Sequence, residues 1–262
     1  MKETIDYKEI NKKAWDKNTQ VHIESDFYDV KGFIDGKSSL NAIEIEQVGD
    51  VKGKDLLHLQ CHFGQDTLSW ARLGANVTGV DLSSASIAQA KKMAQEIGVN
   101  AQFISDDVYS FGDANQQQFD IVYTSYGALC WLPDLNRWAN IVAKSLRVGG
   151  QFNIVEFHCF NDLLSGYSYF STDEPDIEEE GTYTENCTGD KSTMVTWPHS
   201  LSEVIQSLIN AGLTIDEFHE YPYSPYNCFP DLEFVDGKGY QLLFKDQQVP
   251  ILYSIKAQKL AK

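Results

Sequence analysis

The chain has 262 residues, 42% of them hydrophobic, which is enough to fill the core of one α/β domain or of one domain with a sizeable insertion. Its formal charge is −17, with 21 basic against 38 acidic residues and no basic cluster, so we expect neither a nucleic-acid partner nor an anionic membrane surface. No apolar run approaches the ~18 residues of a membrane helix, and the charged stretch MKETIDYKEINKK does not have the apolar core of a secretion signal.

The cysteines are odd in number, widely spaced and without a CxxC pair: Cys61, Cys130, Cys159, Cys187 and Cys228. This pattern is typical of reduced thiols in a cytosolic protein, and it favours neither a disulfide framework nor a zinc cage. We therefore expect a cytoplasmic protein without a metal site.

The first part of the chain differs in character from the rest. Residues 7–18 predict a short helix, and residues 21–41 are rich in turns and aromatic side chains. The first strong strand, LLHLQ, begins only at residue 56. We therefore divide the chain into an N-terminal helix and lid segment over 1–50 and a main domain over 51–262.

From residue 56 onward, strands and helices alternate. The strand LLHLQ leads to Gly64, after which QDTLSWARL forms a helix that ends at Gly74. The next strand, NVTGV, ends at Asp81. Ser83 or Ser84 can cap the following helix, whose apolar residues recur at helical spacing until Gly98. AQFIS is a third strand, followed by Asp106 and Asp107, and FDIVYTS is a fourth.

The alternation continues through a fifth strand. Pro133 suits the first turn of a helix whose apolar face carries Leu135, Trp138, Val142 and Leu146, and RVGG then turns the chain into QFNIVEF. Strands and helices at this spacing indicate right-handed βαβ units. The fold class is therefore α/β, a three-layer, doubly wound sheet that is mostly parallel with helices on both faces.

The last hundred residues predict a different arrangement. The acid-rich DEPDIEEEG is expected to be a mobile surface loop, followed by two hairpin-like segments, GTYTEN and STMVTW. Ser200 and Glu203 form a capping box that opens a helix with Leu201, Val204, Ile205 and Leu208 on its buried face. GLTIDEFHEY and PILYSIKAQK have no helix between them, so we expect an antiparallel pair at the edge of the sheet.

Acidic residues stand at the ends of two predicted strands. In open α/β sheets, ligands bind beyond the carboxyl ends of the strands, which is where Gly64, Asp81 and Asp107 fall. A carboxylate after the second strand can accept hydrogen bonds from a ribose diol, and an acid after the third can accept one from an adenine amino group. Together they indicate a nucleoside site, although strand-end aspartates also serve simply as turn residues and helix caps.

These stretches together carry a resemblance to a known family. LLHLQCHFGQDTLSWARLGANVTGVDLS, FISDDV, FDIVYTSYGAL and LRVGGQFNIVEF resemble the motifs of class I S-adenosylmethionine-dependent methyltransferases over roughly residues 53–157. The resemblance implies a seven-stranded sheet of order 3-2-1-4-5-7-6 with an antiparallel last strand. The first motif departs from the family pattern, since His58 replaces an acidic residue and Gln60 and His62 replace glycines.

The departure itself fits this cofactor better than a dinucleotide. A pyrophosphate needs very close approach of the backbone and hence glycines, whereas S-adenosylmethionine has no phosphate. The resemblance implies that the loop cradles the methionine end and that Asp81 holds the ribose. It also implies contacts of Leu82 and Ser83 near the nucleoside, of Asp107 and Val108 with the adenine, and of Thr124, Ser125 and Tyr126 near the sulfonium. The implied loop contacts are Leu59, Gln60, Cys61, His62, Gly64, Gln65 and Asp66.

The acceptor side has no fixed signature. A sulfonium is already an activated leaving group, so in-line displacement mainly requires positioning, and a general base is needed only if the acceptor must lose a proton. Tyr126, His158 and Glu156 are the candidate catalytic residues, although His158 could equally be held by a neighbouring backbone group. Trp15 and His22 could line a lid over the cofactor or simply pack. Trp131, Trp138 and Trp197 are expected in the core or the cap.

These features predict methyl transfer from S-adenosylmethionine to a small-molecule acceptor by a monomer or homodimer. Insertions at about 160–198 and 220–249 are expected to form a substrate cap. Three alternatives remain: a non-catalytic S-adenosylmethionine-binding protein, a methyltransferase that acts on a protein or RNA, and a nicotinamide oxidoreductase. The sequence does not predict which acceptor or which atom is methylated.

Overall fold

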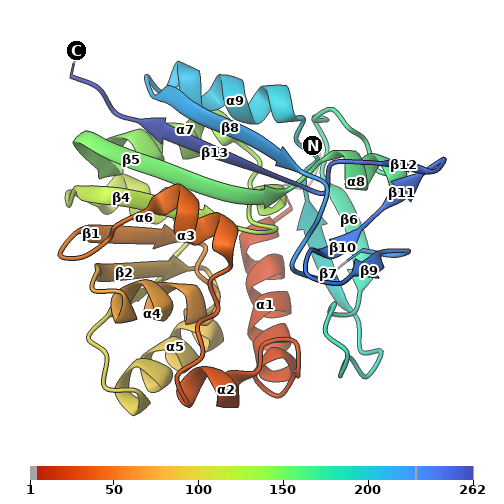
Figure 1. Ribbon diagram of the computed structural model, residues 1–262, viewed down its shortest axis with the longest axis horizontal. Coiled ribbons are helices and arrows are strands. Elements are labelled where there is room, and N and C mark those ends of the chain that lie inside the picture. The colour runs from red at the N-terminus through yellow and green to blue at the C-terminus, as the bar shows by residue number, and fades with distance from the viewer. Residues whose placement is uncertain (1–4, 228, 262) are drawn as a thin grey trace.

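A computed structural model describes residues 5–227 and 229–261 (Figure 1). Seven strands form one sheet in the order β3-β2-β1-β4-β5-β13-β8. The first five run parallel, whereas β13 is antiparallel to both β5 and β8. This arrangement confirms the predicted order and the antiparallel ending. The strands of the sheet are β1 (Asp55–Leu59), β2 (Asn76–Asp81), β3 (Gln102–Ser105), β4 (Phe119–Ser125), β5 (Leu146–Phe157), β8 (Thr214–Tyr221) and β13 (Leu252–Gln258).

Helices cover both faces of this sheet, as predicted (Figure 1). One face packs against the apolar sides of α6 (Val108–Ala114), α7 (Leu135–Ser145) and α9 (Leu201–Asn210). The other packs against α4 (Gln65–Arg72) and α5 (Ser84–Glu96). Since the central strands are buried on both sides, they read as continuous apolar runs and not as alternating ones.

The N-terminal segment is more helical than its sequence suggested. The first helix, α1, extends from Tyr7 to Ile23, beyond the predicted end at residue 18. It is followed by the short helices α2 (Val30–Ile34) and α3 (Ala42–Val48). Helix α1 lies across the carboxyl ends of the parallel strands, between the sheet and a separate hairpin (Figure 1).

The acid-rich stretch is the clearest correction. We expected residues 173–181 to be a mobile surface loop, but Asp176–Glu180 form a strand, β6, that pairs antiparallel with β7 (Ser192–Thr196). GTYTEN is therefore the connection of one hairpin and not a second hairpin. Strand β7 packs against α1, which gives this polar hairpin a partner that its own sequence does not reveal.

Smaller differences concern helix ends. Helix α6 was not predicted, and Pro133 lies before the cap of α7, Asp134, instead of in its first turn. Ser200 caps α9 as expected, but the Glu203 carboxylate contacts the His199 ring 3.2 Å away, so the reciprocal half of the capping box is absent. The remaining elements are the 3₁₀ turn Leu129–Trp131, α8 (Phe160–Leu164), and the short strands β9 (Glu233–Val235), β10 (Gly239–Gln241), β11 (Leu243–Phe244) and β12 (Gln247–Gln248).

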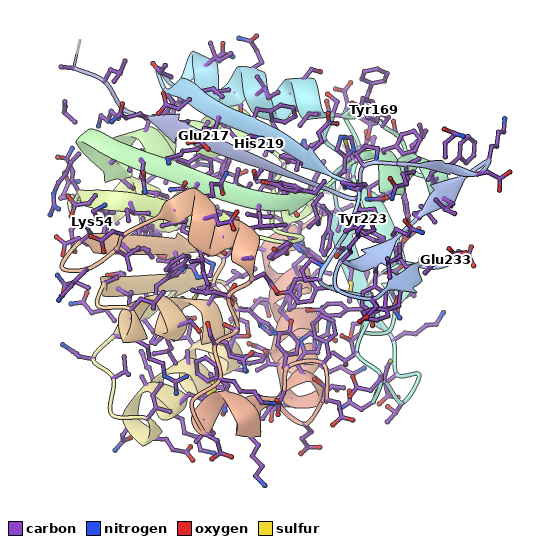
Figure 2. All side chains as sticks on the ribbon, in the orientation of Figure 1. Lys54, Tyr169, Glu217, His219, Tyr223 and Glu233 are labelled. Carbon is purple, nitrogen blue, oxygen red and sulfur yellow. The ribbon has the colours of Figure 1, made fainter. Side chains whose placement is uncertain are left out.

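Strand β8 forms the open edge of the sheet, and its outer surface is charged. Figure 2 shows Glu217 and His219 on this strand, and the Glu217 carboxylate also pairs with Lys256 of β13 at 3.3 Å. Charged side chains on an edge strand discourage pairing with another chain. Within residues 5–227 and 229–261, no helix is long and apolar enough to cross a membrane. The four cysteines in those ranges are free thiols, and Cys228 lies outside them.

The packing of α7 against the sheet can be tested at Trp138. Its ring is fully buried and meets Phe152 of β5 edge-on with centroids 5.4 Å apart, a separation typical of such pairs. We expect Trp138→Ala to lower the free energy of unfolding by about 3–5 kcal/mol, because the cavity would have no side chain to fill it. Asn140→Ala, on the exposed side of the same helix, should change it by less than about 0.5 kcal/mol. Urea denaturation of both variants measures this, and equal losses would contradict the packing described.

Candidate functional site

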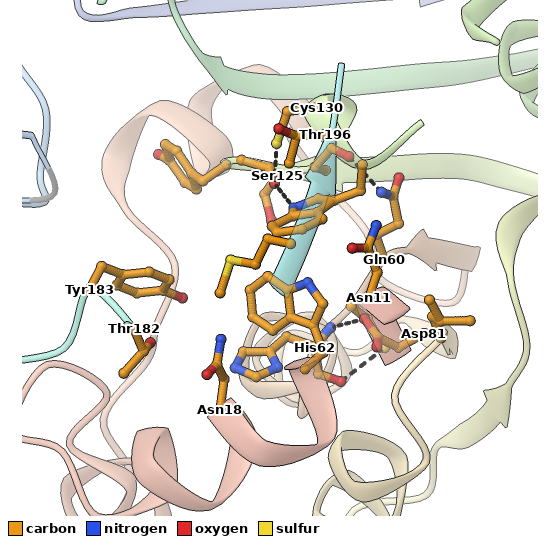
Figure 3. Close-up of a pocket in the computed structure, with 18 of the residues that line it drawn as sticks. Asn11, Asn18, Gln60, His62, Asp81, Ser125, Cys130, Thr182, Tyr183 and Thr196 are labelled. Atoms are coloured by element: carbon orange, nitrogen blue, oxygen red, sulfur yellow. Dashed lines mark hydrogen bonds between the residues drawn. The ribbon is translucent and has the colours of Figure 1, made fainter. Parts of the chain in front are cut away.

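One large cavity, of about 1090 Å³, opens at the carboxyl ends of the parallel strands. Its floor is the loop after β1 together with the ends of β2, β3 and β4, and its roof is α1 with the β6–β7 hairpin (Figure 3). Most of the predicted cofactor contacts border it: Gln60, Cys61, His62, Gly64, Gln65, Asp66, Asp81, Leu82, Asp107, Val108, Ser125 and Tyr126. The residues predicted to contact the cofactor are therefore gathered, for the most part, around one cavity.

The loop after β1 keeps a glycine-like backbone without the glycines. Gln60 and His62 have φ angles of 57° and 49°, and Gly64 has 80°. A left-handed residue other than glycine costs about 1–2 kcal/mol, so neighbouring bonds must compensate. The Gln60 amide donates to the Ala128 carbonyl at 2.6 Å, and the His62 N–H donates to the Asp81 carboxylate at 2.8 Å.

Asp81 is fixed by two backbone bonds and keeps capacity for more. Its Oδ2 accepts from His62 N–H and its Oδ1 accepts from Ser83 N–H, both at 2.8 Å. An ionised carboxylate has about four acceptor positions, so two remain for a ligand. Burial raises the pKa of Asp81 to about 6, since the charged form is poorly hydrated there.

The carboxylates of the two aspartates after β3 differ in how far they are already engaged. Asp107 caps α6 through the N–H groups of Tyr109 and Ser110, and its other oxygen accepts from the Ser110 hydroxyl and from Lys8 of α1, the latter at 2.8 Å. Its acceptor positions are thus filled. Asp106 also borders the cavity, and its carboxylate accepts one bond, from Asp107 N–H at 2.9 Å. Asp106 is therefore the freer carboxylate at the end of this strand.

Glu156, a predicted catalytic residue, instead holds the turn after β4. Its buried carboxylate accepts from the N–H groups of Gly127, Ala128 (2.8 Å), Leu129 (3.1 Å) and Phe157 (2.7 Å). It does not border the cavity. The bonds fix the turn that begins at Tyr126, whose φ angle is 32° and whose side chain does border the cavity.

His158 is likewise absent from the cavity wall. Its Nε2 lies 3.0 Å from the Glu220 carboxylate of β8, and its Nδ1 accepts from Phe160 N–H at 3.1 Å. Because the ring turns toward β8 and is 6% exposed, it is a structural residue at the end of β5. Of the three predicted catalytic side chains, the structure brings only Tyr126 to the site.

Three of the predicted cofactor contacts are fully buried and do not border the cavity. The side chains of Leu59 and Thr124 point into the core, because successive residues of a strand alternate between its faces and Gln60 and Ser125 take the outward positions. Ser83 caps α5, and its hydroxyl donates to Asp16 of α1 at 2.7 Å. Their side chains cannot contact a ligand in the cavity.

His58 and His62 are four residues apart but do not form a metal site. They lie on a strand and a turn and not on a helix, so their rings diverge. The His58 Nδ1 lies 2.8 Å from the Thr67 hydroxyl, whereas the His62 Nε2 lies 2.8 Å from the His22 Nδ1. Burial lowers the pKa of His58 to about 3 and of His22 to about 4, so both rings are neutral. The part of the chain that the structure describes holds no cluster of three or more metal-ligating residues.

Helix α1 attaches to the floor at the residues that surround Asp81. Asp16 accepts from the Ser83 hydroxyl and from Ala85 N–H at 2.9 Å, and the Thr19 hydroxyl lies 2.6 Å from that of Ser86. The ring of Trp15 meets that of His62 with centroids 5.2 Å apart. Trp15 borders the cavity, whereas His22 contacts His62 and does not border it.

The hairpin is bonded to the same helix. The Asn11 amide exchanges two hydrogen bonds with the backbone of Val195 in β7, at 2.7 and 2.9 Å, and the Asn186 amide donates to the Val21 carbonyl at 2.8 Å. Tyr7, Asn11 and Met194 border the cavity but were not predicted, because nothing in their local sequence signals the pairing of α1 with β7. We call α1 and the β6–β7 hairpin together the roof.

The sheet order, the antiparallel last strand and a cavity at the strand ends are those of the class I methyltransferase fold. Residues 56–150 match the family described as "Methyltransferase domain". The sequence-based resemblance is thereby confirmed over these residues.

Curated relatives match about half of the chain. Ubiquinone biosynthesis O-methyltransferase of Klebsiella pneumoniae is 29% identical over 133 residues, which cover 49% of this chain and 54% of the relative. The enzyme of the same description from Serratia proteamaculans is 30% identical over 132 residues, with the same coverage. The chain thus spans about half the length of the curated relatives that it matches.

Solved structures match over more of its length but at lower identity. An S-adenosylmethionine-dependent methyltransferase from Clostridium acetobutylicum has a TM-score of 0.59 at 15% identity, with 96% of this chain and 99% of the other covered. One from Mesorhizobium loti has a TM-score of 0.57 at 20% identity, with 86% and 99% covered. These similarities establish the fold.

Glu156→Gln tests the turn after β4. An amide keeps one acceptor oxygen and turns an NH₂ group toward backbone N–H donors, which would leave buried donors unpaired at about 1–3 kcal/mol each. We expect the free energy of unfolding to fall by at least that amount. Glu220→Gln, which alters one bond at a carboxylate that is 47% exposed, should change it by less than about 1 kcal/mol. Denaturation midpoints that shift equally would show that Glu156 does not hold the turn.

Proposed function

We propose that the chain transfers a methyl group from S-adenosylmethionine to a small-molecule acceptor in this cavity. The observation that carries the proposal is Asp81, a carboxylate held at the end of β2 by two backbone bonds with two acceptor positions left over. A ribose diol supplies two hydroxyl donors and would fill those positions. The left-handed loop from Gln60 to Gly64 beside it offers room along its backbone without the close approach that a pyrophosphate requires.

The remaining floor residues fit the same cofactor. Asp106 would accept from the adenine amino group in place of Asp107, and Leu82 and Val108 also border the cavity. Asp66 and Ser125 would lie near the methionine end; the Asp66 carboxylate accepts from the Ser39 hydroxyl at 2.6 Å and from that of Ser125 at 3.3 Å. When bound, S-adenosylmethionine supplies the activated methyl group, so the residues need only hold the reactants in line.

Tyr126 would act as a hydrogen-bond donor and not as a base. Burial and the charge of Glu44 raise the pKa of its hydroxyl well above the usual value, so it keeps its proton at neutral pH. With Glu156 and His158 away from the wall, the chemistry would rest on positioning by the floor and the roof. We therefore propose that residues 1–50 contribute a lid, with α1 as its central part, and that the 160–198 insertion closes the acceptor side.

The size of the cavity supports an enzyme more than a sensor. Sites for single small ligands have volumes of about 300–1,000 Å³. A cavity of about 1090 Å³ leaves space beyond the cofactor for an acceptor. We also propose the cytoplasmic location, and a monomeric or homodimeric state, on the sequence grounds given above.

Cofactor affinity should depend on pH through Asp81. The ribose hydroxyls donate to the ionised carboxylate, so binding is full above the pKa of about 6 and weakens as the pH falls through that value. We expect the dissociation constant for S-adenosylhomocysteine, measured by calorimetry from pH 5 to 8, to rise toward tenfold per unit below pH 6. Asp81→Asn should bind weakly with little slope over this range; the same slope in that variant would assign the titration to another group.

Substitutions of the two aspartates after β3 should have different effects on cofactor binding and on stability. Asp106→Ala should weaken binding of S-adenosylhomocysteine by about tenfold, the equivalent of 1.4 kcal/mol, with little change in stability. Asp107→Ala should instead cost about 1 kcal/mol of unfolding free energy through the lost cap of α6. Calorimetry and urea denaturation of both variants give the answer. The reverse assignment of the two effects would restore Asp107 as the adenine contact.

A further inference from the structure

Strand β6 presents a row of carboxylates to the cavity. Asp176, Glu178, Glu179 and Glu180 all border it, and Asp176, Glu178 and Glu180, which are two residues apart, project from one face of the strand. On the paired strand β7, Thr196 and Met194 stand opposite Asp176 and Glu178 and border the cavity as well. Figure 3 shows Thr196 on this strand, facing the rings above the floor. The acidic face of β6 therefore borders the cavity, with Asp176 and Glu178 half-buried and Glu180 exposed.

The charges of this row are poorly compensated. Asp162 of α8 adds another carboxylate to the wall, and burial together with the charge of Glu156 raises its pKa to about 6. Burial and a hydrogen bond with Glu178 likewise raise the pKa of Glu180. Across residues 5–227 and 229–261, no salt bridge within 4.0 Å involves any of these four carboxylates: Asp162, Asp176, Glu178 and Glu180.

The cations on the wall are mostly engaged elsewhere. Lys8 pairs with Asp107 at 2.8 Å, and Lys37 pairs with Asp29. Among the described residues, the wall has one further lysine, Lys191, whose charge acts on Glu180, and it has no arginine. The acceptor side therefore has a negative potential that a cationic ligand would neutralise and an anionic one would increase.

The aromatic rings of the cavity favour the same kind of ligand. The rings of Trp15 and Trp131 meet with centroids 5.2 Å apart, and those of Tyr7 and Trp197 with centroids 5.0 Å apart, all on the cavity wall. Aromatic faces attract ammonium groups by about 0.5–2 kcal/mol.

We infer that the acceptor carries an ammonium group, seated between the carboxylates of β6 and the tryptophan rings. The inference rests on the proposed function, because it specifies the acceptor of the same cavity. It concerns recognition, and the methylated atom can be a different atom of that molecule. Acceptors with a carboxylate or phosphate in this position are disfavoured by the row of like charges.

Three probes that share the indole ring and differ in charge test this inference. Tryptamine, 3-methylindole and indole-3-propionate are titrated calorimetrically into the protein, both free and loaded with S-adenosylhomocysteine. We expect tryptamine to bind at least about tenfold more tightly than indole-3-propionate, with 3-methylindole between them. The preference should shrink as salt is raised, because the attraction is partly screened.

A double variant and a matched control locate the effect. Glu178→Gln with Glu180→Gln should weaken tryptamine binding by about five- to tenfold and leave 3-methylindole unchanged. It also removes like-charge repulsion, so the fold should be retained. Glu233→Gln makes the same kind of change on β9, at the outer edge of the molecule and away from the cavity wall (Figure 2), and should alter none of the three affinities.

The outcomes separate the two proposals. Failure of S-adenosylhomocysteine to bind would contradict the proposed function, while titration of the free protein would still report the charge preference. If the cofactor product binds but tryptamine shows no advantage over indole-3-propionate, or does not bind, the inference is overturned. A tryptamine preference that survives in the double variant overturns it as well, because the carboxylates of β6 would then not be its source.

Discussion

The hydrogen bond from the His62 N–H to the Asp81 carboxylate is the interaction on which the site depends. It joins the loop after β1 to the end of β2, and it stabilises a backbone conformation that His62 would otherwise disfavour. The same bond orients a carboxylate whose burial raises its pKa to about 6. A buried charge with unfilled acceptor positions costs stability, and such a cost is typical of a binding site and not of a structural turn.

The roof depends on the same few residues. Helix α1 contacts Ser83, Ser86 and His62, which flank Asp81 on both sides, and it bonds the β6–β7 hairpin through Asn11. Cofactor floor, helix and hairpin are thus connected by direct bonds between segments that lie far apart in sequence.

The parts that could be predicted from sequence are those with a local or periodic cause. Buried strands such as LLHLQ read as apolar runs, Ser83 and Gly74 mark helix ends, and the order of strands follows from right-handed crossovers. Asp81 could be predicted because its spacing behind Gly64 reflects one βαβ unit. The same reasoning selected Asp107 and not Asp106 as the adenine contact, since neither the cap of α6 nor the bond from Lys8 has a signal at residues 106–107.

The errors have a common physical origin in contacts between distant segments. DEPDIEEEG reads as a loop because its strand is stabilised by β7 and α1 and not by its own composition. The sequence places Glu156 and His158 at the end of a strand, near the cleft. In the structure, the Glu156 carboxylate accepts hydrogen bonds from the backbone of residues 127–129, and the His158 ring contacts Glu220. Gln60 and His62 stand where the family pattern has glycine. Their backbones nevertheless have the positive φ angles typical of glycine, and the bonds to Ala128 and Asp81 stabilise this conformation.

The most direct test of the account is a calorimetric titration of the intact chain with S-adenosylhomocysteine and, separately, with NADH. A loop shaped for a phosphate-free nucleoside cofactor predicts binding of S-adenosylhomocysteine at one site in the micromolar range and no binding of NADH. Absence of S-adenosylhomocysteine binding, or binding of NADH in its place, would contradict the central claim that the glycine-poor loop and Asp81 form a methyltransferase cofactor site.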